Sequence, residues 1–164
     1  MTHWLDADEQ RAWLRLAGVM LKLSPALDSQ LQRDCDLTHF DYLCLAMLSS
    51  TDDRTMPMSE LAGLTNASLS RLSHVVTKLQ KRGWVERRPS PHSKRVTLVG
   101  LTEEGWQTLV AAAPGHVETV RALVFEGLSP EDVAALERIA GHIVERIETQ
   151  AVGPGGAARP ATDD

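Results

Sequence analysis

The sequence predicts a mainly α-helical protein with a small β-hairpin wing, in which a winged helix-turn-helix lobe is joined to a second, helical lobe. Three observations predict this class. Apolar residues recur at steps of three and four along several segments, which is the period of amphipathic helices. A short helix, a turn and a longer helix precede two short strands joined by a basic loop. The length of 164 residues fits one compact domain or two small lobes that share a core.

The first long helix is expected over residues 8–33. Its apolar stripe consists of Trp13, Leu16, Met20, Leu23, Leu27 and Leu31. Pro25 lies inside this segment and removes one backbone donor, so a kink is expected near residues 21–24.

A second helix is expected through residues 40–48. Thr38 and Asp41 form a weak capping pair at its start, with Asp in place of the preferred Glu or Gln. The polar residues 49–57 that follow predict a loop.

The central segment predicts the helix-turn-helix and its wing. A short helix over 59–64 and a turn at Asn66 precede a longer helix over 67–82. The residues 84–88 and 96–99 read as two strands, and the Pro- and Ser-rich residues between them predict a turn. This order of elements is that of a winged helix-turn-helix.

Two further helices and a tail complete the chain. Thr102 is the expected N-cap of a helix that is interrupted at Pro114 and then resumes. The residues 129–132 combine an N-cap, a Pro and two acids, a strong start signal for the last helix. The Gly-, Pro- and Ala-rich residues 151–164 predict a disordered tail.

Charge is distributed very unevenly along the chain. The formal net charge is −5, but residues 66–100 hold eight Lys and Arg residues and one acid, a net charge of +7. The remaining residues then carry −12. One basic segment in an acidic protein indicates a patch that binds nucleic acid.

The longer helix of the central segment carries much of this charge. Its apolar residues Leu69, Leu72, Val76 and Leu79 are expected to be buried, and its opposite face contains no apolar and no acidic residue. That face is formed by Ser70, Arg71, Ser73, His74, Thr77, Lys78 and Lys81. A solvated helix face is the alternative, but such faces usually mix Glu with Lys. Hydroxyl, Arg and His side chains instead favour contact with base edges and phosphates in a major groove.

The order and spacing of five segments resemble the MarR family of transcriptional regulators. The segments are MSELA (58–62), SRLSHVVTKL (70–79), GWVER (83–87), VTL (96–98) and LTEEG (101–105). The resemblance extends over about residues 10–149. It implies a homodimer, with a helical dimerisation lobe formed by residues 1–36 and 103–150 and a DNA-binding lobe formed by residues 37–102.

The resemblance also implies an operator of double-stranded DNA with a near-palindromic sequence, bound by a regulator that is more often a repressor than an activator. The recognition helix would enter the major groove and the wing tip the neighbouring minor groove. The residues expected to contact DNA are Ser68, Ser70, Arg71, Ser73, His74, Thr77, Lys78, Arg88, Lys94 and Arg95.

The wing departs from the family pattern at one position. Family members commonly have Asp, any residue and Arg, whereas this chain has Ser93, Lys94 and Arg95. Ser93 can accept a hydrogen bond but carries no charge. We therefore expect a more mobile wing with a stronger contribution from phosphate contacts.

A small-molecule effector is the usual control point in the family. The residues expected to line its pocket are Trp13, Met20, Tyr42, Met47 and His116, and ordinary core packing is the alternative for all five. No cofactor is expected, because neither a set of metal ligands nor a phosphate-binding loop is present. No catalytic constellation is present either, so an enzyme is not expected.

Two alternatives to a ligand-controlled DNA-binding regulator remain. Cys35 and Cys44 could sense oxidants, although Cys35 lies between two Asp residues and Cys44 in an apolar helix. The winged helix could also bind a protein rather than DNA. No apolar run reaches the ~20 residues of a membrane span, and the N-terminal residues lack the pattern of a signal peptide, which favours the cytoplasm.

Overall fold

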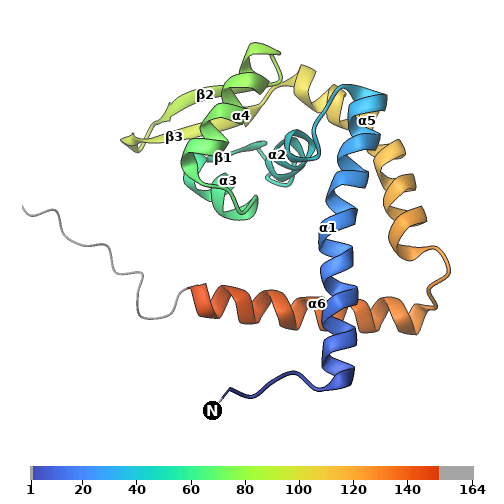
Figure 1. Cartoon of the computed structure of the whole chain (residues 1–164). Helices are drawn as coiled ribbons and strands as arrows, with labels where there is room; N and C mark the ends of the chain where they lie inside the picture. Colours follow the sequence, from blue (N-terminus) through green and yellow to red (C-terminus); the bar gives the residue numbers. More distant parts are fainter. Residues whose placement is uncertain (1, 152–164) are drawn as a thin grey trace, which may run out of the picture. The chain divides into compact units, whose positions relative to one another are not determined.

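The computed structural model describes residues 2–151 and is mainly helical with one small sheet, which confirms the predicted fold class (Figure 1). The predicted tail, 151–164, lies outside the described residues except for Ala151, which ends the last helix. The elements in chain order are α1 (Ala7–Cys35), α2 (His39–Ser49), β1 (Thr55–Pro57), α3 (Met58–Leu64), α4 (Leu69–Lys81), β2 (Val85–Ser90), β3 (Ser93–Leu101), α5 (Glu103–Val120), the π-helical segment η1 (Arg121–Phe125) and α6 (Pro130–Ala151).

The first two helices begin at side-chain caps. The Asp6 carboxylate accepts hydrogen bonds from the backbone N–H groups of Asp8 and Glu9 and starts α1. Thr38 and Asp41 form the predicted capping box of α2. α1 contains Pro25, near which a kink is expected, and continues through it as one helix to Cys35.

The helix-turn-helix forms as predicted, with small changes in its boundaries. Asn66 adopts a left-handed backbone conformation with a φ of 48°, which turns the chain between α3 and α4. α4 begins at Leu69 rather than Ala67 because Ser68 acts as its N-cap and accepts a hydrogen bond from the Arg71 N–H at 3.2 Å. Gly83, with a φ of 76°, follows the end of the helix.

The sheet contains a strand that the sequence did not predict. Its order is β1-β3-β2, with both pairs antiparallel. β1 lies in the segment expected to be a loop, and it pairs Met56 with Val99 of β3. The hairpin strands are also longer than predicted, because Pro89 and Ser90 belong to β2 and leave only Pro91 and His92 as the turn.

α5 corrects a second expectation, since it runs through Pro114 without interruption. The turns around Pro114 are held by packing, because Leu109, Ala112 and His116 are all buried on one side of the helix. Gly115 comes close to the Gln30 side chain of α1, where a β-carbon would lie 3.4 Å from Nε2. Tertiary contacts therefore stabilise a helix that contains a proline.

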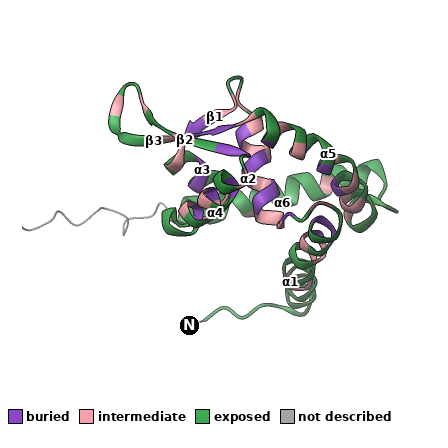
Figure 2. Cartoon of the chain, turned by 90° about the horizontal axis from the view of Figure 1, so that it is seen from above, coloured by how far each residue is buried: buried purple, intermediate pink, exposed green. Residues whose placement is uncertain are grey.

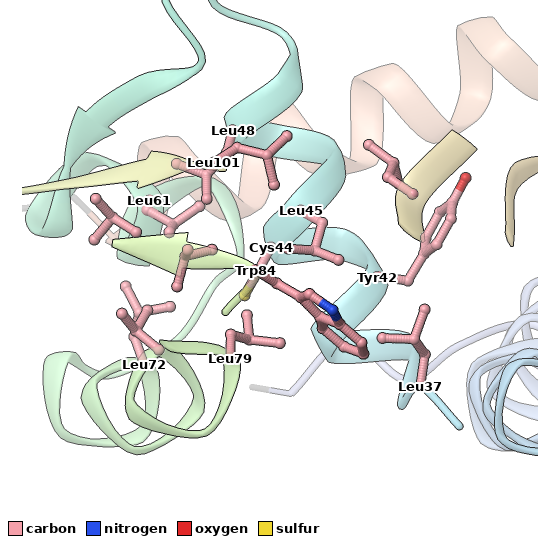
Figure 3. Packing of buried hydrophobic residues seen from close by; sticks show 14 of the residues in the cluster. Leu37, Tyr42, Cys44, Leu45, Leu48, Leu61, Leu72, Leu79, Trp84 and Leu101 are labelled. Carbon is pink, nitrogen blue, oxygen red and sulfur yellow. The ribbon is translucent and has the colours of Figure 1, made fainter. Parts of the chain in front are cut away.

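The hydrophobic core joins α2, α3, α4 and the sheet (Figure 3). Leu72, Val76 and Leu79 of α4 are completely buried in it, as predicted. Leu69 was expected to join them but is 57% exposed, because it occupies the first turn of α4 outside the cluster. Figure 2 shows the contrast between the buried α2 and the exposed far end of the hairpin.

The chain divides into two compact units, residues up to Leu123 and residues from Val124 on. In the first unit, α1 packs against α5 and α2 through its C-terminal half, where Leu27 and Leu31 are buried. Its N-terminal half leaves large apolar side chains exposed, namely Trp13, Leu14, Leu16, Val19, Met20 and Leu21. In the second unit, α6 leaves exposed Val133, Leu136, Ile139, Val144 and Ile147.

Candidate nucleic-acid interface

The outer face of α4 is polar and free of acids. Ser70, Arg71 and His74 are exposed, and Ser73 and Thr77 are half-buried. No residue of α4 is acidic. A helix that offers hydroxyl, imidazole and guanidinium groups without a carboxylate has the chemistry to contact base edges and phosphates.

The wing places a second group of cations beside this helix, because β2 packs against α4 (Figure 1). Lys94 and Arg95 are exposed at the start of β3, next to the hairpin turn. Neither forms an ion pair with any described residue. Ser93 Oγ accepts a hydrogen bond from the Arg95 N–H at 3.4 Å, which is the uncharged contact expected where the family usually has Asp.

Arg87 links the wing to the helix, a role that the sequence did not reveal. From β2, its Nη2 donates to the Ser73 carbonyl oxygen at 2.6 Å and lies 3.4 Å from Ser73 Oγ. Its Nε is buried without a partner among the described residues. The only sequence signal was its membership of the basic segment, because a contact between residues 14 positions apart leaves no local pattern.

An open cavity of about 380 Å³ lies between α3, α4 and the start of β3. Two guanidinium groups and three hydroxyl groups face it beside three apolar side chains. Its lining residues are Met58, Ser59, Leu69, Ser73, Arg87, Arg95, Val96 and Thr97.

Two residues predicted to contact DNA also contact α2. The Arg71 guanidinium lies over the Phe40 ring, 4.3 Å from its centre. The Lys78 ammonium forms an ion pair with the buried Asp41 carboxylate at 2.5 Å. In this stacked position the N–H groups of Arg71 can still donate hydrogen bonds to DNA. The charge of Lys78, in contrast, is paired with a protein carboxylate.

Two other basic residues of the central segment also have partners within the protein. Arg82 donates to the Asp36 carbonyl oxygen at 2.8 Å and stacks on the Trp84 ring. Arg88, predicted to contact DNA, is exposed, donates to Thr55 Oγ1 at 3.2 Å and lies 3.9 Å from the Glu86 carboxylate. The formal charge of residues 66–100 is therefore larger than the charge that is available to bind phosphates.

The residues predicted to line an effector pocket differ in their surroundings. Trp13 and Met20 are exposed on α1, and Met47 packs against the core. Tyr42 and His116 lie against each other, with ring centres 4.3 Å apart. A cavity of about 430 Å³ lies between α1, α2 and α4, lined by Ser24, Pro25, Asp28, His39, Phe40, Leu43 and Arg71.

His39, which lines this cavity, and His116, which lies against His39, both have lowered pKa values. Burial lowers the pKa of His116, and the nearby His39 lowers it further. Burial also lowers the pKa of His39, against the opposing effect of the Asp28 carboxylate. The two rings lie 5.6 Å apart, and both imidazoles therefore favour the neutral form.

The thiols are not activated. Burial raises the pKa of Cys44 to about 12, with a further contribution from Asp41. Burial and the neighbouring Asp34 also raise the pKa of Cys35. Within the described residues, no three His, Cys, Asp or Glu side chains gather as metal ligands. No helix among them combines the length and hydropathy required to cross a membrane.

A short helix, a tight turn and an acid-free second helix flanked by a basic hairpin define a winged helix-turn-helix protein of the DNA-binding class. A sequence model of the MarR family matches residues 37–97. The chain is 38% identical to Sco3205, a MarR family transcriptional regulator from Streptomyces coelicolor whose crystal structure is in complex with DNA. That match covers 98% of this chain and 97% of Sco3205, with a TM-score of 0.83. The chain belongs to the MarR family.

Two other relatives agree with this assignment. AbsC, a MarR family transcriptional regulator from Streptomyces coelicolor, is 36% identical over 90% of this chain and 99% of its own, with a TM-score of 0.85. The transcriptional repressor MprA of Escherichia coli is 28% identical over 107 residues, 65% of this chain. The match spans 60% of the length of MprA. All three relatives are transcriptional regulators.

Proposed function

We propose that this protein is a transcriptional repressor that binds a near-palindromic operator as a homodimer. The observation that carries the proposal is the acid-free outer face of α4 beside a hairpin whose Lys94 and Arg95 have no ion-pair partner among residues 2–151. The DNA complex of Sco3205, a relative of nearly equal extent, supports it. As a DNA-binding regulator without a catalytic role, the protein would act in the cytoplasm.

In this proposal α4 enters the major groove and the hairpin turn reaches the adjacent minor groove. Ser70, Arg71, Ser73, His74 and Thr77 face base edges and phosphates. Ser68 caps α4, which leaves its hydroxyl oxygen partly committed to the Arg71 N–H. Arg88, Lys94 and Arg95 supply phosphate contacts along the wing.

The dimer is proposed from the apolar side chains that the single chain leaves exposed. The N-terminal half of α1 and the length of α6 each carry such side chains at helical spacing, including Leu16, Met20, Leu136 and Ile139. A partner subunit would cover them. The helical dimerisation lobe then consists of residues 1–36 and 103–150, and the winged lobe of residues 37–102.

The charge distribution would orient the dimer on DNA. The residues outside 66–100 carry a net charge of −12 and repel the phosphate backbone, while the wing and α4 attract it. Two subunits related by a two-fold axis would meet half-sites about 34–36 Å apart, one turn of the double helix. Affinity should fall steeply with salt because several phosphates are neutralised.

Relief by a small-molecule effector is also part of the proposal. The cavity of about 430 Å³ between α1, α2 and α4 is large enough for such a ligand, and Arg71 on its edge belongs to the proposed DNA-binding face. Sensing through a thiol has less support, because the raised pKa values of Cys35 and Cys44 disfavour the reactive thiolate.

The proposal is tested by footprinting the intergenic DNA beside the protein's own gene, across a series of salt concentrations. We expect protection of a near-palindromic site and a linear decrease of log affinity with log salt. No protection at low salt would favour a winged helix that binds a protein instead. The same footprint repeated with candidate ligands tests whether an effector releases the DNA.

A further inference from the structure

Lys78 and Asp41 form an ion pair in the first unit that joins the recognition helix α4 to the start of α2. The Lys78 Nζ lies 2.5 Å from Asp41 Oδ2. The Asp41 side chain is 2% exposed and the Lys78 side chain is 47% exposed. The carboxylate is therefore withdrawn from water, while the lysine reaches inward to it from the surface.

Asp41 has few other means of stabilising its charge. Its Oδ2 also accepts a hydrogen bond from the Thr38 N–H at 2.9 Å, as part of the capping box. Its Oδ1 is buried and has no hydrogen-bond partner among the described residues. Of the ion pairs formed by residues 2–151, only that with Lys78 involves Asp41. A buried carboxylate deprived of its cation is strongly destabilising, so the ammonium is held in place.

A second contact follows the same side of α4. Arg71 precedes Lys78 by seven residues, two turns of an α-helix, and therefore lies on the same face. Its guanidinium stacks on Phe40, the residue before Asp41. The first turn of α2 thus contacts α4 at two points.

We infer that Lys78 is a positioning residue, which fixes α4 against α2 through Asp41 and does not neutralise a DNA phosphate. This inference rests on the proposed DNA-binding function and revises one of the contacts expected from the sequence. Lys78 lies on the basic outer face by sequence, but its charge is already balanced inside the protein. Lys94 provides the contrast, because it is exposed and no ion pair ties it to another described residue.

The salt dependence of operator binding separates the two roles. A lysine that contacts a phosphate contributes about 0.9 to the slope of log affinity against log salt. We would compare Lys78→Met, Asp41→Asn and the double variant with wild type, with Lys94→Met as the matched control. Met preserves the length of the lysine stem, and the double variant removes both charges without leaving a buried charge unpaired.

Three results are expected. Lys78→Met and the double variant keep the wild-type slope, even if the affinity of Lys78→Met is lower. Asp41→Asn has a steeper slope, because it releases the Lys78 ammonium toward the DNA, and this steepening disappears in the double variant. Lys94→Met has a slope shallower by about 0.9 per subunit. A role limited to stability would not produce the steepening.

A slope of the double variant that is shallower than wild type by about 0.9 per subunit would overturn the inference, because Lys78 would then contact a phosphate. Thermal unfolding without DNA keeps this test separate from the proposed function. There we expect Lys78→Met, which leaves the buried Asp41 carboxylate without its cation, to melt below the double variant. Equal melting of Lys78→Met, the double variant and the wild type would overturn the pairing, whether or not the wild type binds DNA.

Discussion

The N-terminal half of α1 and the recognition helix α4 have the same kind of sequence pattern but differ in burial. Both carry apolar residues at steps of three and four. In α4, Leu72, Val76 and Leu79 are completely buried by the chain itself. In α1, Trp13 is 51% exposed and Met20 is 55% exposed.

The difference teaches that helical periodicity identifies an apolar face that will be buried. It does not show whether the same chain or a second subunit buries that face. The core of the winged lobe is closed within one subunit, so α4 can present its polar face to a ligand. The face of α1 is left for a second copy in the proposed homodimer. Folding of the lobe and assembly of the dimer should therefore respond to different substitutions.

The largest effect is expected at the buried face of α4. Leu72→Ala should lower the free energy of unfolding by about 2–5 kcal/mol, because it leaves a cavity in a fully packed site. Leu69→Ala, on the exposed first turn of the same helix, should cost far less. Urea denaturation of both variants measures the difference, and equal losses would contradict the burial assigned to these two leucines.

A charge in the apolar face of α1 should act on assembly instead. We expect Leu16→Glu to weaken subunit association by roughly tenfold or more, because the carboxylate would lose its hydration in an apolar interface. The helical content measured by circular dichroism should stay close to that of wild type. Sedimentation over a range of protein concentrations measures the dissociation constant.

Lys22→Glu is the control for that experiment, because Lys22 is exposed on α1 outside the apolar stripe. It should leave the dimer intact. A wild-type protein that remains monomeric at concentrations where it binds its operator would contradict the comparison between α1 and α4.

The wing offers a third test within the basic segment. Arg95→Ala should make the salt dependence of operator binding shallower by about 0.9 per subunit, since its guanidinium is exposed and unpaired among the described residues. Arg82→Ala removes the same charge from a residue that binds Asp36 and Trp84, so its slope should be unchanged. An unchanged slope for Arg95→Ala would refute the proposed role of the wing tip.

The smallest effect is expected from pH. Burial lowers the pKa of His116 in the folded protein, so the unfolded chain binds more protons once the pH falls below about 6.5. Stability should be unaffected by this group above that pH and should decrease as the pH falls through it. His116→Phe should reduce the loss of melting temperature between pH 7.5 and pH 5.5.

His92→Gln, on the exposed turn of the wing, serves as its control. It should leave the pH dependence of melting as in wild type. If His116→Phe and His92→Gln gave the same profile, the buried imidazole would not contribute to acid sensitivity.

Features that depend on neighbouring residues were predictable from the sequence. The capping pair of Thr38 and Asp41, the turn at Asn66 and the start of α5 after Thr102 all rest on contacts within a few positions. The polar face of α4 followed in the same way from a period of 3.6 residues. These local signals were sufficient for the fold class and for the family resemblance.

Features that depend on distant partners were not predictable. β1 is only three residues long and exists because Met56 pairs with Val99, far along the chain. The ion pair of Lys78 is an example, because nothing near Lys78 in sequence indicates Asp41, which lies 37 positions earlier. The contact of Arg87 with Ser73 was missed for the same reason. A count of charged residues along the sequence locates a basic surface. Only the folded structure shows which of its cations are paired with protein groups and which are free.

The central claim, that the outer face of α4 lies in the DNA groove of a dimeric complex, can be tested by attaching a DNA-cleaving reagent to it. Ser70→Cys would carry the reagent in a Cys35→Ser background, where the remaining Cys44 is completely buried. We predict two clusters of cuts inside the protected operator, about one helical turn apart. No cleavage, or the same cleavage from His142→Cys on α6, would contradict the claim.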